Sequence, residues 1–414
     1  MNTNKLIGSI MIIIGTTVGA GMLALPMVGA ASGFAWSSLL MIVAWAMSTI
    51  SGLLVIEINL ALPSHACSYS AMAEQTLGNW GKIITWFSYL FLLYAIITAY
   101  IIGASGFITD TFAPMLHVEI PSFIGAILFT IILGSAVYWS TQAVDNFNRV
   151  LITFKGLFLI AALVLIMPHI HITKLIPVAS ERSSQIAYLW SAIPTFVCAF
   201  GFHFVIPSLR IYLGEKYNHL KIAVIVGTTV ALLIYLWWML AILGIIPLQG
   251  DNSFTSFAGT VEASKPSAFI NFLASIINNR WITNSIVWFS NIALTTSFLG
   301  VALGLFDFLA EGFKRKNNRF GRLQTFGLTF IPPLFFAIFY PKGFIIAIQY
   351  SSIFFVILAL ILPALMVYKL RKNKKLKSLY QVKCGSITIS LVAVFGIISA
   401  VFALMYIFNM LPKL

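Results

Sequence analysis

The sequence predicts an all-α polytopic membrane protein with eleven spans, its N-terminus inside and its C-terminus outside. Three observations predict this class: few charged residues, long apolar runs, and glycine and proline near the middle of the first and sixth runs. The two interrupted runs each begin a block of five spans. A last run follows the second block.

The composition excludes a water-exposed surface over most of the chain. Of its 414 residues, 60% are hydrophobic and only 9% are charged, and the mean hydropathy is +0.98. A soluble domain carries about 25% charged residues. Most of the chain must therefore face lipid. Helices satisfy their own backbone hydrogen bonds there, and the apolar runs are too continuous for the alternating strands of a membrane barrel.

The apolar runs are long enough for eleven spans, since a span needs roughly 20 residues. They cover residues 6–30, 35–60, 83–112, 121–140, 144–168, 185–211, 220–248, 282–312, 323–340, 343–369 and 385–411.

Lysine and arginine predict the orientation of these spans. Of the 25 basic residues, 19 fall on the side of the N-terminus: five in 314–322, seven in 369–383, and Lys5, Lys82, Arg149, Lys155, Arg210, Lys216 and Lys221. The other 6 fall on the opposite side. Cytoplasmic loops carry such an excess, so the N-terminus is predicted inside. These short loops also explain the net charge of +14 without a nucleic-acid partner, and they are expected to contact anionic lipid.

No cofactor, metal or disulfide is predicted. The three cysteines, Cys67, Cys198 and Cys384, are far apart and form no CxxC pair. The sequence has no HExxH motif and no carboxylate pair at mid-span, so an enzyme is not expected. Nothing indicates the repeated filter of a channel. An embedded enzyme or a channel stays a distant alternative.

The first span contains three glycines within seven residues, followed by a proline, in the segment GTTVGAGMLALP (15–26). In a helix interior each glycine costs about 1 kcal/mol and a proline about 3. In lipid the freed backbone groups need other partners. Such a segment indicates a broken helix with a function or, alternatively, close packing through small residues.

The sixth span favours the first interpretation. In PTFVCAFGFHFVIP (194–207), Gly201 lies two residues before His203, between two prolines. Broken helices at the head of two five-span blocks are typical of inverted-repeat transporters, whose site lies at mid-membrane. We therefore expect repeats at 1–168 and 184–371 and an accessory span at 384–411. Half-helix N-termini attract a carboxylate, and freed carbonyls bind a cation or an ammonium group.

Four segments resemble the bacterial hydroxy/aromatic amino acid permeases: GTTVGAGMLALP (15–26), SAIPTFVCAFGFHFVIPSL (191–209), ALTTSFLGVALGLFDFLAEGF (293–313) and GRLQTFGLTFIPPLFFAIFYPKGF (321–344). The resemblance covers about residues 5–411. It implies a leucine-transporter-like 5+5 inverted repeat plus one helix, in the bacterial inner membrane. It also implies uptake of an aromatic amino acid, L-tyrosine first, by proton symport. Tryptophan, phenylalanine and sodium coupling stay open as alternatives.

The resemblance also implies which residues bind the substrate. In that fold, the unwound first helix holds the carboxylate and the amine through its backbone, and the matching residues here are Thr16, Thr17, Gly19, Ala20 and Gly21. Exposed amides suit a zwitterion because they need no charged side chain. Packing is the alternative.

The residues that match the sixth-helix break are Phe200, Gly201, Phe202 and His203. A glycine lets the ligand approach the backbone closely, and a ring can stack on a substrate ring for about 1 kcal/mol. His203 is a mid-span ionisable residue, expected to bind a substrate phenol or to pass a proton. A neutral histidine bonded to a freed carbonyl is the structural alternative.

Two tyrosines of the third span, Tyr94 and Tyr100, are further candidates to line the site. The sequence does not predict which face of this helix is turned to the substrate.

Lys155, in the fifth span, is the candidate coupling residue. In proton-coupled relatives of the fold, a lysine here resembles a replacement for a sodium ion, between the first and eighth helices. A lysine that reaches the headgroups is the alternative. On the eighth span, Thr295, Thr296 and Ser297 are expected to face this position. They match sodium ligands of other members, so sodium coupling stays open.

Three carboxylates, Glu57, Asp307 and Glu311, lie toward the inner ends of the second and eighth spans. Asp307 and Glu311 are one helical turn apart. We expect all three to pair with basic residues of the inner loops, as gate or anchor.

Overall fold

The computed structural model describes residues 3–63, 68–117, 120–139, 141–175, 182–214, 217–260, 265–315, 318–373, 378–383 and 385–412. All regular elements in this part of the chain are helical. Cys67 and Cys384 lie outside it, and Cys198 is a free thiol.

The described residues contain ten helices that are long and apolar enough to cross a membrane. The sequence predicted eleven spans, and the difference lies in the first one. That span is divided between α1 (Thr3–Thr17) and α2 (Ala24–Gly29), and α2 continues through a 3-10 turn into α3 (Gly33–Ala61). Neither α1 nor α2 is long enough to span alone, so the eleven-span count stays a prediction.

The other long helices follow the predicted runs closely. They are α5 (Asn79–Leu116), α6 (Ser122–Trp139), α7 (Thr141–Ile166), α8 (Arg182–Cys198) with α9 (Ile206–Leu213), α10 (Tyr217–Ile245), α13 (Arg280–Gly312), α14 (Arg319–Phe339), α15 (Phe344–Val356) with α16 (Leu362–Lys372), and α17 (Gly385–Ile407). Short helices are α4 (Tyr69–Leu77), α11 (Phe254–Ala258) and α12 (Pro266–Ile277).

Polar side chains mark where several of these helices begin. Asn279 Oδ1 accepts hydrogen bonds from the backbone N–H of Trp281 and Ile282, and Asn318 Oδ1 accepts one from Gly321. These caps satisfy N–H groups that a helix leaves unpaired at its first turn. Between α15 and α16 the chain forms a π turn (Ile357–Ile361) just before Pro363, which has no N–H to donate.

The outer surface of the helical body is apolar. Ile132, Ile331 and Ile387 are 61–67% exposed, on α6, α14 and α17. Exposed apolar area of this extent is unfavourable in water and favourable in lipid. Large aromatic side chains are fully buried inside the body, among them Phe196 on α8 and Tyr235 and Trp238 on α10.

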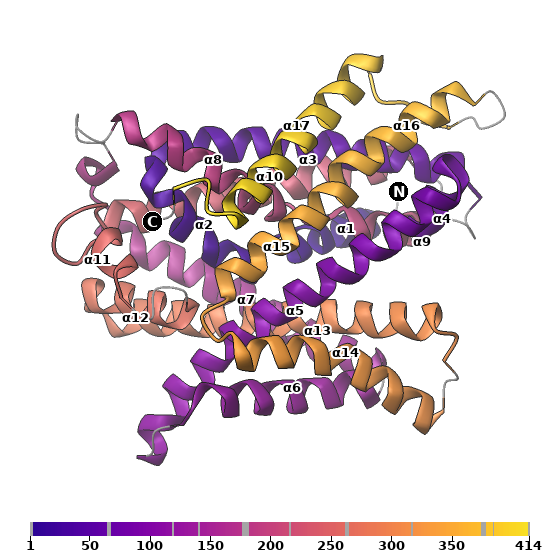
Figure 1. Ribbon diagram of the computed structural model, residues 1–414. Helices are drawn as coiled ribbons and strands as arrows, with labels where there is room; N and C mark the ends of the chain where they lie inside the picture. The colour runs from indigo at the N-terminus through magenta and orange to yellow at the C-terminus, as the bar shows by residue number, and fades with distance from the viewer. Residues whose placement is uncertain are drawn as a thin grey trace.

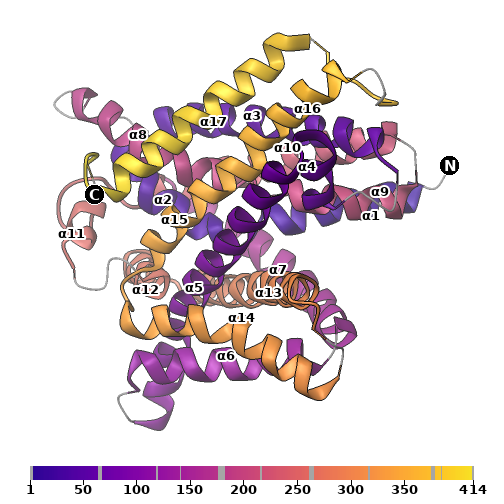
Figure 2. The same ribbon diagram turned by 45° about the vertical axis from the view of Figure 1, so that its right-hand side comes forward.

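The chain ends lie at opposite ends of the helical body. In Figures 1 and 2 the N-terminus lies near α9, and the C-terminus lies near α2 and α11. The end of α13, the start of α14 and the end of α16 lie on the same side of the body as the N-terminus. Which end faces the cytoplasm stays a prediction.

Candidate substrate and coupling site

The first break lies between α1 and α2. Helix α1 ends at Thr17, Gly19 is extended (φ −132°, ψ −160°), and a 3-10 turn begins at Ala20. The backbone N–H of Ala20 donates to Ser297 Oγ on α13 (3.4 Å). A Cβ added at Gly19 would lie 2.7 Å from the same oxygen. Glycine is therefore favoured here because a larger residue would have to displace Ser297, whereas its dihedral angles are open to other residues.

The second break lies between α8 and α9. Helix α8 ends at Cys198, a 3-10 turn begins at His203, and α9 begins at Ile206. Near the end of α8, the Ala199 N–H donates to the carbonyl oxygen of Thr195 (3.0 Å), and the Phe200 N–H donates to that of Val197 (3.1 Å). The chain thus leaves the helix over four residues.

The two breaks face one cavity of about 160 Å³. From the first break it is lined by Thr16, Thr17, Gly19 and Gly21, and from the second by Thr195, Cys198, Ala199 and Gly201. Tyr100 of α5 and Ser297 of α13 also line it, and the other walls are mainly apolar: Leu92, Leu93, Ile96, Ala99, Val301, Phe204, Ile348, Ser351 and Phe355.

No charged side chain of the described residues lines this cavity. Its polarity comes from hydroxyl groups, a thiol and the backbone ends of two helices. The hydroxyl of Thr195 is buried and has no hydrogen-bond partner within the described residues. A ligand that is neutral overall but carries both charges fits these walls, because helix ends supply partial charges of both signs.

Lys155 of α7 binds the first break. The residue is 5% exposed. Its ammonium group donates to the carbonyl oxygens of Val18 (2.9 Å) and Gly15 (3.2 Å). These carbonyls lie where α1 ends and lacks its own donors. A cation is favoured at a helix C-terminus, so the lysine stabilises the break.

The three predicted residues of α13 have different surroundings. Ser297 reaches the first break and lines the cavity. Thr296 is buried, and its hydroxyl donates to the carbonyl of Ala293 in its own helix (3.2 Å). Thr295 is half-buried. Helices α7 and α13 pack against each other, which brings this stretch near Lys155.

Residues 2–403 match the tryptophan/tyrosine permease family. The chain is 36% identical to tyrosine-specific transport system 1 of Haemophilus influenzae over 400 residues, which is 95% of each protein. It is 32% identical to the tryptophan-specific transport protein of Shigella flexneri over 99% of the chain and 97% of that protein. It is 33% identical to the low affinity tryptophan permease of Escherichia coli, over 98% of the chain and 96% of that protein.

The chain belongs to the tryptophan/tyrosine permease family. It is thus a transport protein rather than an enzyme, and its apolar helices make it a multi-pass membrane protein.

Three candidates of the sixth-helix break lie outside the permease's cavity lining. Phe200, Phe202 and His203 are all fully buried. The Phe200 ring packs edge-on against Tyr235 (5.4 Å), and Phe202 lies against α3, where a Cβ at Gly52 would be 2.6 Å from its ring. These side chains hold the break in place, and of the four candidates Gly201 lines the cavity.

His203 is bonded to the backbone of α3. Its Nε2 lies 3.1 Å from the carbonyl oxygen of Ser48, and its ring stacks on Phe202 (4.5 Å) and meets Phe355 edge-on. Nδ1 has no partner among the described residues. The bonded carbonyl belongs to a continuous helix, not to one of the breaks. A role for His203 in substrate binding or proton passage stays a prediction.

The two tyrosines of α5 face different spaces. Tyr100 lines the cavity, whereas the Tyr94 hydroxyl donates to the carbonyl of Leu328 on α14 (2.7 Å). Tyr94 lines a separate, mostly apolar groove of about 610 Å³ between α5, α14 and α15. Six residues turn a helix by about 240°, so one helix cannot present both side chains to one site.

The three predicted gate or anchor carboxylates also differ in their surroundings. Glu57 is fully buried, and its carboxylate accepts two hydrogen bonds from Arg371 (both 2.7 Å) and one from the Val382 N–H (2.8 Å). It thereby ties α3 to α16 and to the segment before α17. Asp307 and Glu311 are exposed near the end of α13.

Sequence reasoning missed two polar side chains that join helices. The Tyr235 hydroxyl of α10 donates to the carbonyls of Thr17 (2.6 Å) and Ala199 (2.9 Å). Arg210 of α9 binds the carbonyls of Asn59 and Leu62 at the end of α3. An arginine in an apolar run was a signal that could have been followed. A tyrosine among apolar neighbours gave none.

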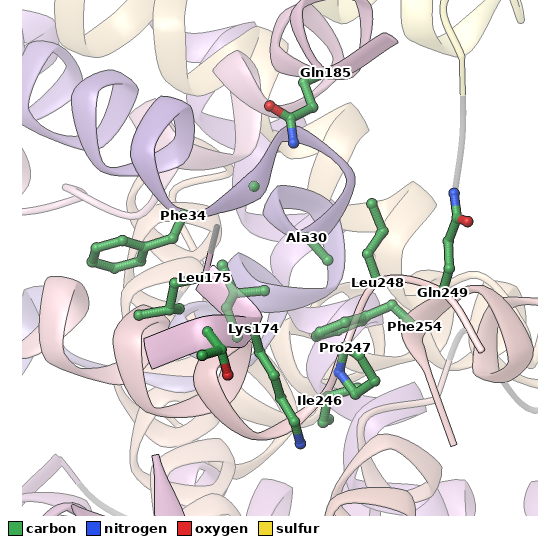
Figure 3. A pocket seen from close by; sticks show the side chains of 13 residues that line it. Ala30, Phe34, Lys174, Leu175, Gln185, Ile246, Pro247, Leu248, Gln249 and Phe254 are labelled. Carbon is green, nitrogen blue, oxygen red and sulfur yellow. The ribbon is translucent and has the colours of Figure 1, made fainter. Parts of the chain in front are cut away.

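A second pocket, of about 210 Å³, shares no lining residue with the cavity. Figure 3 shows Ala30 and Phe34 on its wall near the turn from α2 to α3, with Gln185 of α8 directed toward that turn. Lys174 also lines it, but its ammonium donates to the carbonyl of Ile245 (2.6 Å) at the end of α10. That lysine is a helix cap.

Proposed function

We propose that this permease imports an aromatic amino acid, L-tyrosine first, by proton symport across the bacterial inner membrane. One observation carries the proposal: two broken helices meet at a cavity that no charged side chain of the described residues lines, and a buried lysine donates to carbonyls of the first break. Two relatives named as tyrosine-specific are 36% and 35% identical to the chain, those named for tryptophan are 32–34% identical, and a tyrosine permease is 27% identical.

The cavity suits the two ends of an amino acid. The carbonyls of Thr17 and Ala199 end two helices and carry partial negative charge, which favours an ammonium group. The N–H groups at the start of the next turns carry partial positive charge, which favours a carboxylate, and Gly21 and Phe204 of these turns line the cavity. Tyr100 and the apolar wall are left for the ring.

Coupling to protons rests on Lys155. Its ammonium occupies the place at the end of α1 where a bound cation would be stabilised by carbonyl oxygens. Losing the proton weakens two charge-assisted hydrogen bonds at once, which loosens the first break. In this proposal repeats 1–168 and 184–371 move against each other, with 384–411 as an added span, eleven spans in all and the N-terminus inside. Sodium symport is the alternative.

Uptake of labelled L-tyrosine into proteoliposomes tests the proposal. We expect accumulation under an inward proton gradient without sodium, and competition by tyrosine above tryptophan and phenylalanine, with none by leucine. A sodium gradient that drives uptake where a proton gradient does not would overturn proton coupling. Tryptophan competing better than tyrosine would reassign the substrate. If no aromatic amino acid competes, the substrate class is wrong.

Gly19→Ala is expected to weaken L-tyrosine binding. The new methyl group would lie 2.7 Å from Ser297 Oγ, so α13 must shift or lose its bond to Ala20. Overpacking of this kind costs about 1–3 kcal/mol, which is roughly a 5- to 150-fold loss of affinity.

Gly300→Ala is the matched control for this variant. Gly300 lies on α13, the helix that carries Ser297, at an exposed position where an added Cβ meets nothing within 4 Å. Equilibrium binding of labelled L-tyrosine in detergent compares the two variants. Equal affinity of Gly19→Ala and Gly300→Ala would mean that the contact with Ser297 has no part in binding.

A further inference from the structure

The hydroxyl of Tyr235 lies between the two breaks. The side chain is fully buried, and its oxygen is 2.6 Å from the carbonyl oxygen of Thr17 and 2.9 Å from that of Ala199. Thr17 is the last residue of α1, and Ala199 directly follows α8. One side chain from a third helix, α10, thus contacts the C-terminal ends of both broken helices.

At the first break four other carbonyls have donors that are not Tyr235. Ile14 accepts from the Val18 N–H (2.7 Å), Gly15 and Val18 accept from Lys155, and Gly19 accepts from the Met22 N–H (3.2 Å). The Thr17 carbonyl is the one that Tyr235 serves. Tyr235 and Lys155 therefore reach the end of α1 from two different helices, α10 and α7.

At the second break the pattern is the same. The carbonyls of Thr195 and Val197 accept from N–H groups of the chain that leaves the helix, and the Ala199 carbonyl accepts from Tyr235. The Phe200 ring then packs edge-on against the tyrosine ring at 5.4 Å. The ring is thus held by the same segment whose carbonyl its hydroxyl binds.

A phenol has one hydrogen, and here it lies between two acceptors. Without it, two carbonyl oxygens with partial negative charge at helix ends would lose the donor that they share. With it, both are kept together, yet each retains lone pairs that the single hydrogen leaves unused. Thr17 and Ala199 both line the cavity, so the ends of both helices lie beside the space for a ligand with several N–H groups.

We propose that Tyr235 is the positioning residue that holds the two breaks together and so forms the binding site for the substrate's ammonium group. This inference rests on the proposed function, since it assigns the amine end of an amino acid to the two carbonyls. The tyrosine acts through the backbone of α1 and α8 and needs no contact with the ligand. A site assembled in advance binds more tightly, because the ligand does not have to order it.

Tyr235→Phe tests this role, because it removes one oxygen and keeps the ring. We expect affinity for L-tyrosine to fall about tenfold, in line with the loss of one buried hydrogen-bond donor. Competition against labelled L-tyrosine is then measured with tyramine, which keeps the amine, and with 3-(4-hydroxyphenyl)propanoate, which lacks it. Tyramine should lose affinity by a similar factor, and the amine-free acid should bind wild type and variant alike.

Tyr94→Phe is the matched control. It also removes a phenol that donates to a backbone carbonyl at 2.7 Å, but outside the cavity. It should leave the affinity for all three compounds unchanged. Thermal unfolding in detergent checks that both variants fold, and the rise in midpoint that each compound causes gives a second measure of binding.

Several outcomes would overturn the inference: L-tyrosine affinity in Tyr235→Phe equal to wild type, an equal loss for the amine-free acid, or an equal loss in Tyr94→Phe. If the amine-free acid does not compete with wild type, the loss for L-tyrosine and tyramine alone decides. Failure of the proposed function is separate, because wild type itself would then bind no aromatic amino acid.

Discussion

Lys155→Met is expected to abolish concentrative uptake. Methionine has nearly the length of lysine but cannot carry a proton, and it leaves the carbonyls of Gly15 and Val18 without their donor. Each unpaired buried carbonyl costs about 1–3 kcal/mol. We expect the accumulation ratio of L-tyrosine in proteoliposomes to fall to that of an uncoupled carrier. Exchange across the membrane, which needs no net proton movement, should persist.

Lys174→Met provides the control for this variant. Lys174 also donates to a carbonyl at a helix end, that of Ile245 at 2.6 Å, but it contributes nothing to the central cavity. This variant should keep gradient-driven uptake and lose only stability. Full accumulation by Lys155→Met would remove the lysine from the coupling mechanism. Loss of accumulation in both variants would point to a general defect.

The spans could be predicted from the sequence because lipid leaves few alternatives to long apolar helices. The breaks were indicated because glycine and proline are costly in a helix interior. Gly19 is the clearest case: a Cβ there would lie 2.7 Å from Ser297 Oγ, so any other residue would force a shift. Such a glycine can be recognised in the sequence because its free-energy cost in a helix interior must be offset elsewhere in the structure.

Helix rotation could not be predicted, and it decides which side chains meet the cavity. Tyr94 and Tyr100 looked alike in the sequence, yet one binds Leu328 and the other lines the site. His203 could be picked out as a lone mid-span histidine, but its contact with the carbonyl of Ser48 could not, and its functional role stays a prediction. In a chain with apolar residues on every face, no periodic pattern distinguishes the inward side of a helix.

Tyr235 illustrates the same limit. It lies in the run LLIYLWWML, where a tyrosine is chemically unremarkable among aromatic neighbours. Its role depends on two carbonyls that are 218 and 36 residues away in the chain. Contacts with backbone atoms leave no signature in the residue types of the partners. The broken helices could therefore be predicted, and the side chain that joins them could not.

Glu57→Ala is expected to lower the stability of the folded permease more than removal of any surface carboxylate. The Glu57 side chain is 1% exposed and binds Arg371, which is 21% exposed, together with the Val382 N–H. Removing one partner of a buried ion pair costs about 3–5 kcal/mol. Because Arg371 retains some contact with solvent, the lower end of that range applies. The midpoint of thermal unfolding in detergent measures the effect.

Glu74→Ala is the matched control for Glu57→Ala, because it removes one partner of an exposed ion pair. Glu74 pairs with Lys82 at 3.0 Å, but both side chains are nearly half exposed, at 46% and 47%. Exposed pairs contribute about 0–1 kcal/mol, so this variant should unfold close to wild type. Glu57→Leu combined with Arg371→Met should recover much of the lost stability, because an apolar pair leaves no buried charge unpaired. If both single variants unfold alike, the buried pair is not what holds α3 to α16.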